Sequence, residues 1–262
     1  MQFETIIYDV KDNIARITLN RPDANNAMNV QMTRDLCYAA MDTSENQLVR
    51  GILITGTGKT FCPGGDIKSF ASAGENLPGI LKEMTSYLHL AISRFTRGQA
   101  PVIVAVNGIA AGAGLSLACM GDMLLVAESA RFTMAYTQIG LSPDGGATYF
   151  LPRLIGLRHT QELALTNRQL SAKEALNWGI ATEVVPDSEL MSRSNALVMQ
   201  VAAGATTAFG ATRRLIQSGL TENLETQMEF ESQSIVEMSR TADAQNTISA
   251  FVQKRLAKKD IK

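Results

Sequence analysis

Three short apolar runs, separated by stretches of mixed polarity, constrain the fold of this chain more than any other feature of its sequence. They cover residues 51–55, Val102–Val106 and Met123–Ala127. Continuous apolar runs of this length are typical of strands that are buried on both faces. Because they alternate with helical segments, they favour an α/β domain built on a largely parallel sheet.

The two ends of the chain differ in character. Residues 5–10 and 14–19 have a strand-like composition and flank a turn-prone Lys-Asp-Asn, which predicts a hairpin or two adjacent strands. A helix is predicted over residues 30–43. Beyond about residue 151 the sequence favours helix, with segments at 160–166, Ala172–Trp178, 189–203, 221–240 and 242–256 and one strand candidate at 182–185. We therefore expect an α/β core followed by a helical C-terminal region.

Composition narrows the class of protein. Of the 262 residues, 45% are hydrophobic, and 24 basic residues against 25 acidic ones leave a net charge of −1. This balance argues against nucleic acid or an anionic membrane as the main partner. The N-terminus lacks the pattern of a signal peptide, and no apolar run is long enough to span a bilayer. With two histidines and three scattered cysteines, neither a metal site nor a disulfide framework is expected, which favours a reducing cytoplasm.

Three glycine-rich segments follow or lie near the predicted strands, at residues 61–67, 107–114 and 140–146. Glycine and alanine allow a ligand to approach the backbone closely, and a helix N-terminus leaves N–H groups unpaired. One N–H group from each of two loops would form an oxyanion hole. Tight turns and close helix packing are the alternative interpretation of each segment alone. Neither a P-loop nor a dinucleotide-binding fingerprint is present.

In order and spacing, the motifs of this chain resemble those of the crotonase (enoyl-CoA hydratase/isomerase) superfamily, and the resemblance covers essentially the whole sequence. The matching motifs are NRP at 20–22, NAM at 26–28, FCPGGDI at 61–67, PVIVAVNG at 101–108, residues 132–146, AKEALNWGI at 172–180, VVP at 184–186 and FVQKR at 251–255. The resemblance implies an α/β fold with a ββα spiral core over residues 1–200. It also implies a helical trimerisation or lid region over residues 201–262. The family serves many reactions with one thioester platform, so these motifs do not select a reaction.

The same resemblance implies roles for individual residues. The oxyanion donors would be the N–H groups of Gly65 and Ala113, where relatives usually have glycine at the second position. Asp66 is expected to cap or orient its loop, and Cys62 to pack rather than to act as a nucleophile. An acyl-CoA thioester would be the substrate, with no separate cofactor and no metal. Its CoA part would contact Asn26, Ala27, Cys62, Gly64, Asp66, Ile67, Phe251 and Lys254, although Lys254 could equally be a solvated helix charge.

The residues at the reaction centre depart from those of the family hydratases. Two glutamates activate water in those enzymes, and this chain has Ser116 and Tyr136 at the two positions. Asp144 lies in a Ser-Pro-Asp-Gly-Gly turn on the expected acyl side. Relatives with an acidic residue there include 1,2-epoxyphenylacetyl-CoA isomerases and some Δ3,Δ2-enoyl-CoA isomerases. Double-bond isomerisation is therefore favoured, with Asp144 moving the proton, and an Asx-turn is its structural alternative.

Three other functions stay open at this point. One is 2-enoyl-CoA hydration with atypical residues. Another is dehalogenation of a haloaryl-CoA or a related thioester hydrolysis, since His89 and Asp144 match the base and nucleophile of those relatives. The third is acyl-CoA binding without catalysis. The resemblance further implies a homotrimer or a dimer of trimers.

Overall fold

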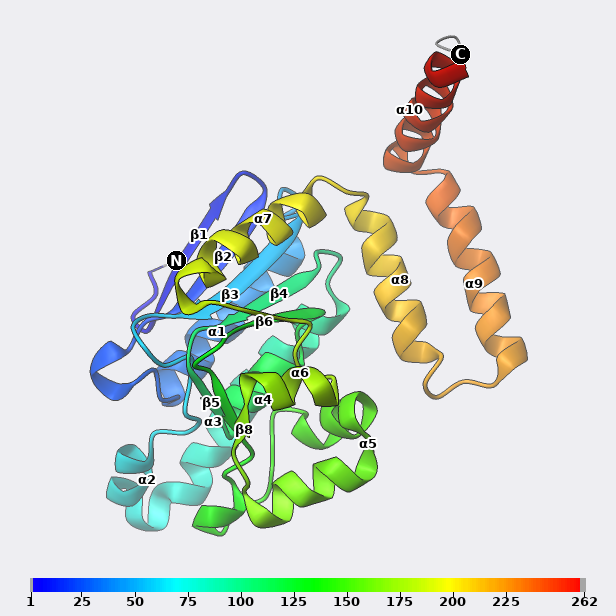
Figure 1. Ribbon diagram of the computed structural model, residues 1–262. Helices are drawn as coiled ribbons and strands as arrows, with labels where there is room; N and C mark the ends of the chain where they lie inside the picture. The colour runs from blue at the N-terminus through cyan, green and yellow to red at the C-terminus, as the bar shows by residue number, and fades with distance from the viewer. Residues whose placement is uncertain (1, 260–262) are drawn as a thin grey trace.

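The centre of the molecule is a six-stranded sheet in the order β1-β2-β3-β4-β6-β9 (Figure 1). The computed structural model describes residues 2–259, without the side chains of residues 254–259. The strands are β1 (Ile6–Lys11), β2 (Ile14–Leu19), β3 (Gly51–Gly56), β4 (Val102–Val106), β6 (Met123–Ala127) and β9 (Glu183–Val185). The β1–β2 pair is the predicted hairpin, and all other pairs in this sheet are parallel. The prediction of a largely parallel sheet is confirmed.

Helices cover both faces of this sheet, which explains why its central strands are apolar throughout. On one face, α7 (Leu190–Ala202) packs Val198 into a cluster with Leu53 and Ile103. On the other face, α1 (Val30–Glu45) and α3 (Leu77–Arg97) enclose a larger core that includes Ile54 and Phe95. Neighbouring residues along β3 therefore point to opposite cores, as the two-residue period of a strand requires.

A second, three-stranded sheet was not predicted. It consists of β5 (Ile109–Ala111), β7 (Arg131–Thr133) and β8 (Leu170–Ser171). These strands have two or three residues each, too few to show a period in the sequence. The sheet lies beside α4 (Ala113–Cys119), so it fixes the chain on both sides of the second glycine-rich segment.

Two helices also differ from the prediction. Helix α5 spans Ala147–Thr166, whereas only residues 160–166 were predicted. Pro152 and the non-helical Gly156 (φ 77°, ψ 165°) interrupt it, which obscures its helical period. Helix α8 (Thr206–Ser218) was not predicted, because its threonines and central glycine have low helix propensity.

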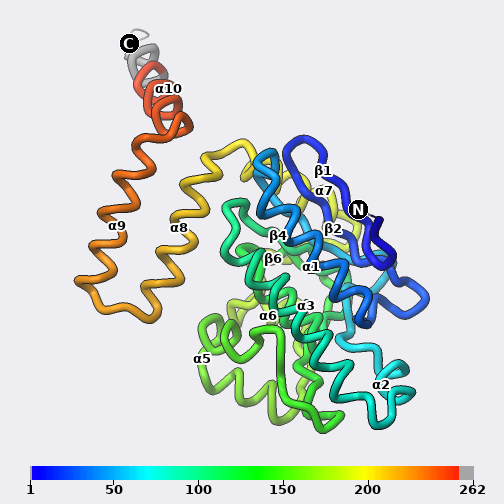
Figure 2. Tube along the Cα trace, turned by 180° about the vertical axis from the view of Figure 1, so that it is seen from behind, coloured from blue at the N-terminus to red at the C-terminus, as the bar shows by residue number. Residues whose placement is uncertain are grey.

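Helix α8 contacts α3, whereas α9 (Leu224–Ser239) and α10 (Ala242–Lys259) extend away from the sheet and its flanking helices (Figures 1 and 2). Arg213 fixes α8 to the core: its guanidinium pairs with Asp122 at 2.7 Å and donates to the carbonyls of Phe95, Gly98 and Ala100. No residue of α9 is buried. The predicted domain boundary at residue 200 falls inside α7 and stays a prediction.

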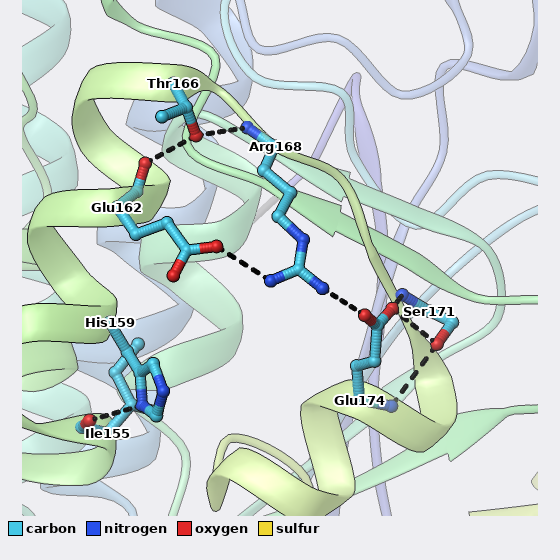
Figure 3. Close-up of polar contacts among 7 residues, drawn as sticks. All are labelled: Ile155, His159, Glu162, Thr166, Arg168, Ser171 and Glu174. Atoms are coloured by element: carbon cyan, nitrogen blue, oxygen red, sulfur yellow. Dashed lines mark hydrogen bonds and ion pairs between the residues drawn. The ribbon is translucent and has the colours of Figure 1, made fainter.

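Helix α6 (Ala172–Trp178) is joined to α5 by an ionic contact at the surface. Arg168 lies between Glu162 of α5 and Glu174 of α6 (Figure 3). Glu174 also forms a capping box with Ser171, the residue before the helix. The ion pairs are more than one-third exposed, so they orient α6 more than they stabilise it.

Candidate active site

A mainly apolar cavity of about 430 Å³ lies between the first glycine-rich segment, α3 and the chain after β7. Its lining brings together most of the predicted reaction-centre residues: Gly65, Ala113, Tyr136 and Asp144. Ser116 lies behind the lining and is fully buried. The remaining lining residues are Thr33, Pro63, Gly64, Ile67, Phe70, Leu81, Met84, Thr85, Leu88, Gly112, Ala135, Gln138, Ile139, Leu141, Ser142 and Pro143.

The first glycine-rich loop is held in place by its backbone. Cys62 donates its N–H to the carbonyl of Ile109 and accepts from the N–H of Ala111. Two residues on, Met28 donates to the carbonyl of Gly64 and accepts from the N–H of Asp66. The loop is thus paired on both sides, while the N–H of Gly65 donates no hydrogen bond within the part of the chain that the structure describes.

Asp66 and Cys62 act structurally in this loop, as predicted. The Asp66 carboxylate caps α2 (Ile67–Ala73) by accepting from the N–H of Ser69, and it pairs with Arg21 at 3.0 Å. Burial acts to raise the pKa of Asp66, but the Ser69 and Arg21 hydrogen bonds outweigh it and hold that pKa below its usual range. Burial raises the pKa of the Cys62 thiol to about 12, so this thiol is not a nucleophile at neutral pH.

The second glycine-rich loop packs against the first at glycines that leave little or no room for a Cβ atom. A Cβ atom on Gly114 would lie 2.1 Å from the carbonyl oxygen of Cys62. Gly64 has φ +101°, and its added Cβ would lie 3.5 Å from the nitrogen of Ala113. Ala113 is the first residue of α4, and its N–H also donates no hydrogen bond among the described residues. Two unpaired N–H groups on adjoining loops can together stabilise a negative oxygen.

Side chains form a second part of the cavity and its surroundings. The phenol of Tyr136 donates to Oδ1 of Asp144 at 2.5 Å. The Ser116 hydroxyl is within 2.9 Å of both the Tyr136 oxygen and the main-chain carbonyl of Asp144. Burial, together with the negative charge of Asp144, raises the pKa of Tyr136 well above its ordinary value. The phenol therefore stays protonated and acts as a hydrogen-bond donor.

His89 contacts the Asp144 turn from outside the cavity. It is an exposed residue of α3 that is not part of the lining, and its Nε2 accepts a hydrogen bond from the N–H of Gly145 at 3.1 Å. A ring nitrogen that accepts a hydrogen bond does so through its lone pair. The lone pair of Nε2 is thus already engaged by the N–H of Gly145.

The predicted CoA contacts fall into two groups. Gly64 and Ile67 line the cavity, and Ala27, Cys62 and Asp66 lie at the same loop. The Asn26 side chain, in contrast, is fully buried and bonds to Arg21, Thr57 and Thr60 of the protein itself. It therefore holds the loop together and has no side-chain group free for a ligand.

Phe251 and Lys254 belong to α10, which lies away from the cavity-bearing part of the chain (Figures 1 and 2). The structure does not bring them to the cavity of their own chain. The side chain of Lys254 lies outside the described residues, so its predicted contact with CoA stays a prediction.

Two residues of the cavity could not be recognised from the sequence. Phe70 places its ring over Gly65, where a Cβ atom would lie 2.4 Å from the ring. Ala135 has φ +56°, which is unusual for a residue other than glycine. Phe70 lies in a Ser-Phe-Ala stretch and Ala135 in a Met-Ala-Tyr stretch, and neither stretch has a distinctive spacing. Only the folded structure shows that both residues belong to the cavity.

Two kinds of feature are absent from the described residues. Among them, no group of three or more His, Cys, Asp or Glu side chains could hold a metal ion. Over the same residues, every helix is too short or too polar to cross a lipid bilayer.

Several known proteins are similar to this chain over nearly its whole length. The model of the enoyl-CoA hydratase/isomerase family matches residues 9–259. A Rhodobacter capsulatus protein named as a probable enoyl-CoA hydratase is 37% identical, with 97% of each chain covered. The 1,2-epoxyphenylacetyl-CoA isomerase of Escherichia coli is 35% identical over 96% of this chain and 97% of its own. The solved structure of enoyl-CoA hydratase from Bacillus anthracis is 29% identical, with a TM-score of 0.90 over 96% of this chain and 97% of that one. The predicted crotonase-like fold is confirmed, and the chain belongs to the enoyl-CoA hydratase/isomerase family of the crotonase superfamily.

Proposed function

We propose that this protein isomerises the double bond of an enoyl-CoA thioester, with Asp144 as the only proton carrier. The observation that carries the proposal is that Asp144 is the one ionisable carboxylate among the described residues that line the cavity. The N–H groups of Gly65 and Ala113 would bind the thioester oxygen. CoA is part of the substrate, and no separate cofactor is needed.

The chemistry follows from this arrangement. Asp144 removes a proton from C2 of a 3-enoyl thioester, and the electron pair of that C–H bond enters a dienolate. Its negative oxygen is stabilised by the two N–H groups. The protonated Asp144 then delivers the proton to C4, which leaves the double bond between C2 and C3.

Hydration is less well supported by this site. Efficient addition of water in the family uses two carboxylates, and Ser116 and Tyr136 occupy their positions. The serine is fully buried, and the raised pKa of Tyr136 keeps its phenol protonated. Neither group can remove a proton from water at neutral pH.

Dehalogenation and thioester hydrolysis are disfavoured by a different contact. By the resemblance to the haloaryl-CoA dehalogenases, both would rest on His89, whose free ring nitrogen would take a proton from water. The Nε2 of His89 already accepts from Gly145, and the residue is outside the cavity lining. The resemblance to the E. coli isomerase gives further support to isomerisation, while the R. capsulatus relative is named for hydration.

The decisive experiment compares 3-enoyl-CoA and 2-enoyl-CoA as substrates of wild type, Asp144→Ala and Asp23→Ala. The product of isomerisation is a conjugated thioester, which is followed by its absorbance. We expect turnover of 3-enoyl-CoA by wild type, a loss of about 10²- to 10⁴-fold in Asp144→Ala, and no change in Asp23→Ala, since Asp23 is exposed and outside the cavity lining.

Two results would overturn the proposal. Rapid hydration of 2-enoyl-CoA by wild type would show that water is activated without the glutamate pair. Binding of CoA esters with no turnover of any of them would identify a non-catalytic acyl-CoA-binding protein.

A further inference from the structure

We propose that Tyr136 is a positioning residue that holds Asp144 by Oδ1, so that both proton transfers pass through Oδ2. This inference rests on the proposed isomerase function and concerns the same site. It assigns a task to a residue that stands where the family hydratases have a glutamate.

The contacts around Asp144 carry the first step. The carboxylate accepts from the Tyr136 phenol at 2.5 Å through Oδ1. Within the described part of the chain, Oδ2 has no hydrogen-bond partner. The main chain of the same residue is held as well, because Ser116 donates to its carbonyl at 2.9 Å. One carboxylate oxygen is thus fixed and the other is left for the substrate.

The backbone before Tyr136 carries the second step. The N–H of Tyr136 donates to the carbonyl of Met134, two residues earlier, at 2.7 Å. The residue between them, Ala135, has φ +56°. Together these describe a γ-turn of the rare, positive-φ kind, which is strained for any residue with a Cβ atom. Strain of this kind is retained at functional sites, and here the turn directs the phenol toward Asp144.

The protonation state of the phenol carries the third step. Since Tyr136 stays protonated, it can donate to Oδ1 both when Asp144 is ionised and when Oδ2 carries the substrate proton. The phenol proton itself does not move in this cycle. The C2–H bond breaks and the Oδ2–H bond forms in the first transfer, and the Oδ2–H bond breaks and the C4–H bond forms in the second.

A carboxylate held in this way cannot easily rotate to present its other oxygen to water. The proton taken from C2 is therefore returned to C4 of the same molecule more often than it is exchanged with solvent. Removal of the phenol hydroxyl should release the carboxylate, which lowers the rate and increases exchange.

The test uses Tyr136→Phe, which keeps the ring and removes only the hydroxyl, and Tyr136→Met as a second variant without a donor. Isomerisation of 3-enoyl-CoA is run in D₂O, and the deuterium content of the product is measured by mass spectrometry. We expect kcat to fall about 10- to 100-fold, as for a misplaced catalytic group, with KM within about twofold of wild type and more deuterium in the product. Tyr149→Phe is the matched control, because Tyr149 is an exposed residue of α5 outside the cavity lining.

The outcomes separate the two proposals. If wild type does not isomerise, or if Asp144→Ala remains active, the proposed function itself fails. If Asp144→Ala is inactive but the Tyr136 variants keep the kcat and deuterium content of wild type, only the positioning role is overturned. A rise in KM with unchanged kcat would also overturn it, since Tyr136 would then contact substrate rather than hold the base.

Discussion

The two sides of the cavity are built in different ways. The backbone wall, residues 62–66 and 110–114, is held by main-chain hydrogen bonds and by glycines in contact with neighbouring backbone. The side-chain wall, Ser116, Tyr136 and Asp144, is held by hydroxyl and carboxylate groups that bond to one another and to the Asp144 carbonyl. The backbone wall offers N–H groups that survive every substitution except one by proline, whereas every group of the side-chain wall depends on residue type.

This difference explains how one family can share a platform and vary its chemistry. At the proposed oxyanion position, Ala113 keeps the backbone N–H donor that a glycine would supply. On the other wall, the serine and tyrosine at the positions where the resemblance implies glutamates would change what the site can do to a proton. Substitutions should therefore affect stability most in the backbone wall and turnover most in the side-chain wall.

The largest effect on stability is expected for Gly114→Ala in the backbone wall. The new Cβ would lie 2.1 Å from the Cys62 carbonyl oxygen, so the two loops must separate. We expect the free energy of unfolding to fall by about 3 kcal/mol and activity to be lost. Gly79→Ala in α3 is the control, since nothing lies within 4 Å of its added Cβ and a gain of about 0.5–1 kcal/mol is expected. Chemical denaturation of both variants checks the pair, and equal stabilities would contradict the tight contact between the loops.

A smaller effect on stability is expected for Ser116→Ala in the side-chain wall. The carbonyl of Asp144 loses its buried donor, which should cost about 1–2 kcal/mol. Turnover should fall about tenfold or more, because the Asp144 turn is less firmly held. Ser86→Ala removes a similar hydroxyl from an exposed position of α3 and should leave both quantities unchanged. If Ser116→Ala keeps the kcat of wild type, Ser116 does not help to hold the Asp144 turn.

The cap at the end of the backbone wall should make stability depend on pH. Hydrogen bonds and Arg21 lower the pKa of Asp66 in the folded state, so its contribution is present above the ordinary pKa of an aspartate. It is lost as the pH falls through that value and on through the lower folded-state pKa. At pH 7, the free energy of unfolding of Asp66→Ala should be about 1 kcal/mol lower than that of wild type. Denaturation at a series of pH values should show this difference shrinking in acid, and a constant difference would contradict the assignment.

The smallest effect is expected for Ala135→Gly, just before the side-chain wall. Glycine adopts a positive φ without strain, so the free energy of unfolding should stay the same or rise by about 0.5 kcal/mol. Ala71→Gly in exposed α2 makes the same exchange in a helix and should lower it by about 0.5–1 kcal/mol. Thermal unfolding of the two variants gives the comparison. A clear loss of stability in Ala135→Gly would show that the turn is not strained.

The two walls also differed in how far the sequence predicted them. The strands that position the backbone wall are continuous apolar runs, which the sequence shows directly. Its glycines are also recognisable in the sequence, because glycine allows two backbone segments to approach closely. The contact between Tyr136 and Asp144 depends on a γ-turn at an alanine, for which the sequence has no marker. The role of His89 depends on which of its ring nitrogens faces Gly145, which the sequence does not show. The three-stranded sheet could not be predicted because its strands are too short to show a period. Local pattern thus predicts elements and close approaches, but not the direction of a side chain in an irregular segment.

The separation of the interacting residues along the chain has a consequence for how the site assembles. The Tyr136 phenol and the Asp144 carboxylate are only 8 residues apart. The main-chain bridge between Cys62 and Ala110, in contrast, closes a loop that contains all of α2 and α3. The entropic cost of closing a loop rises with its length, so the turn that carries the proposed base can form early while the proposed oxyanion donors meet late. During refolding, the return of activity should therefore follow the closure of the long loop.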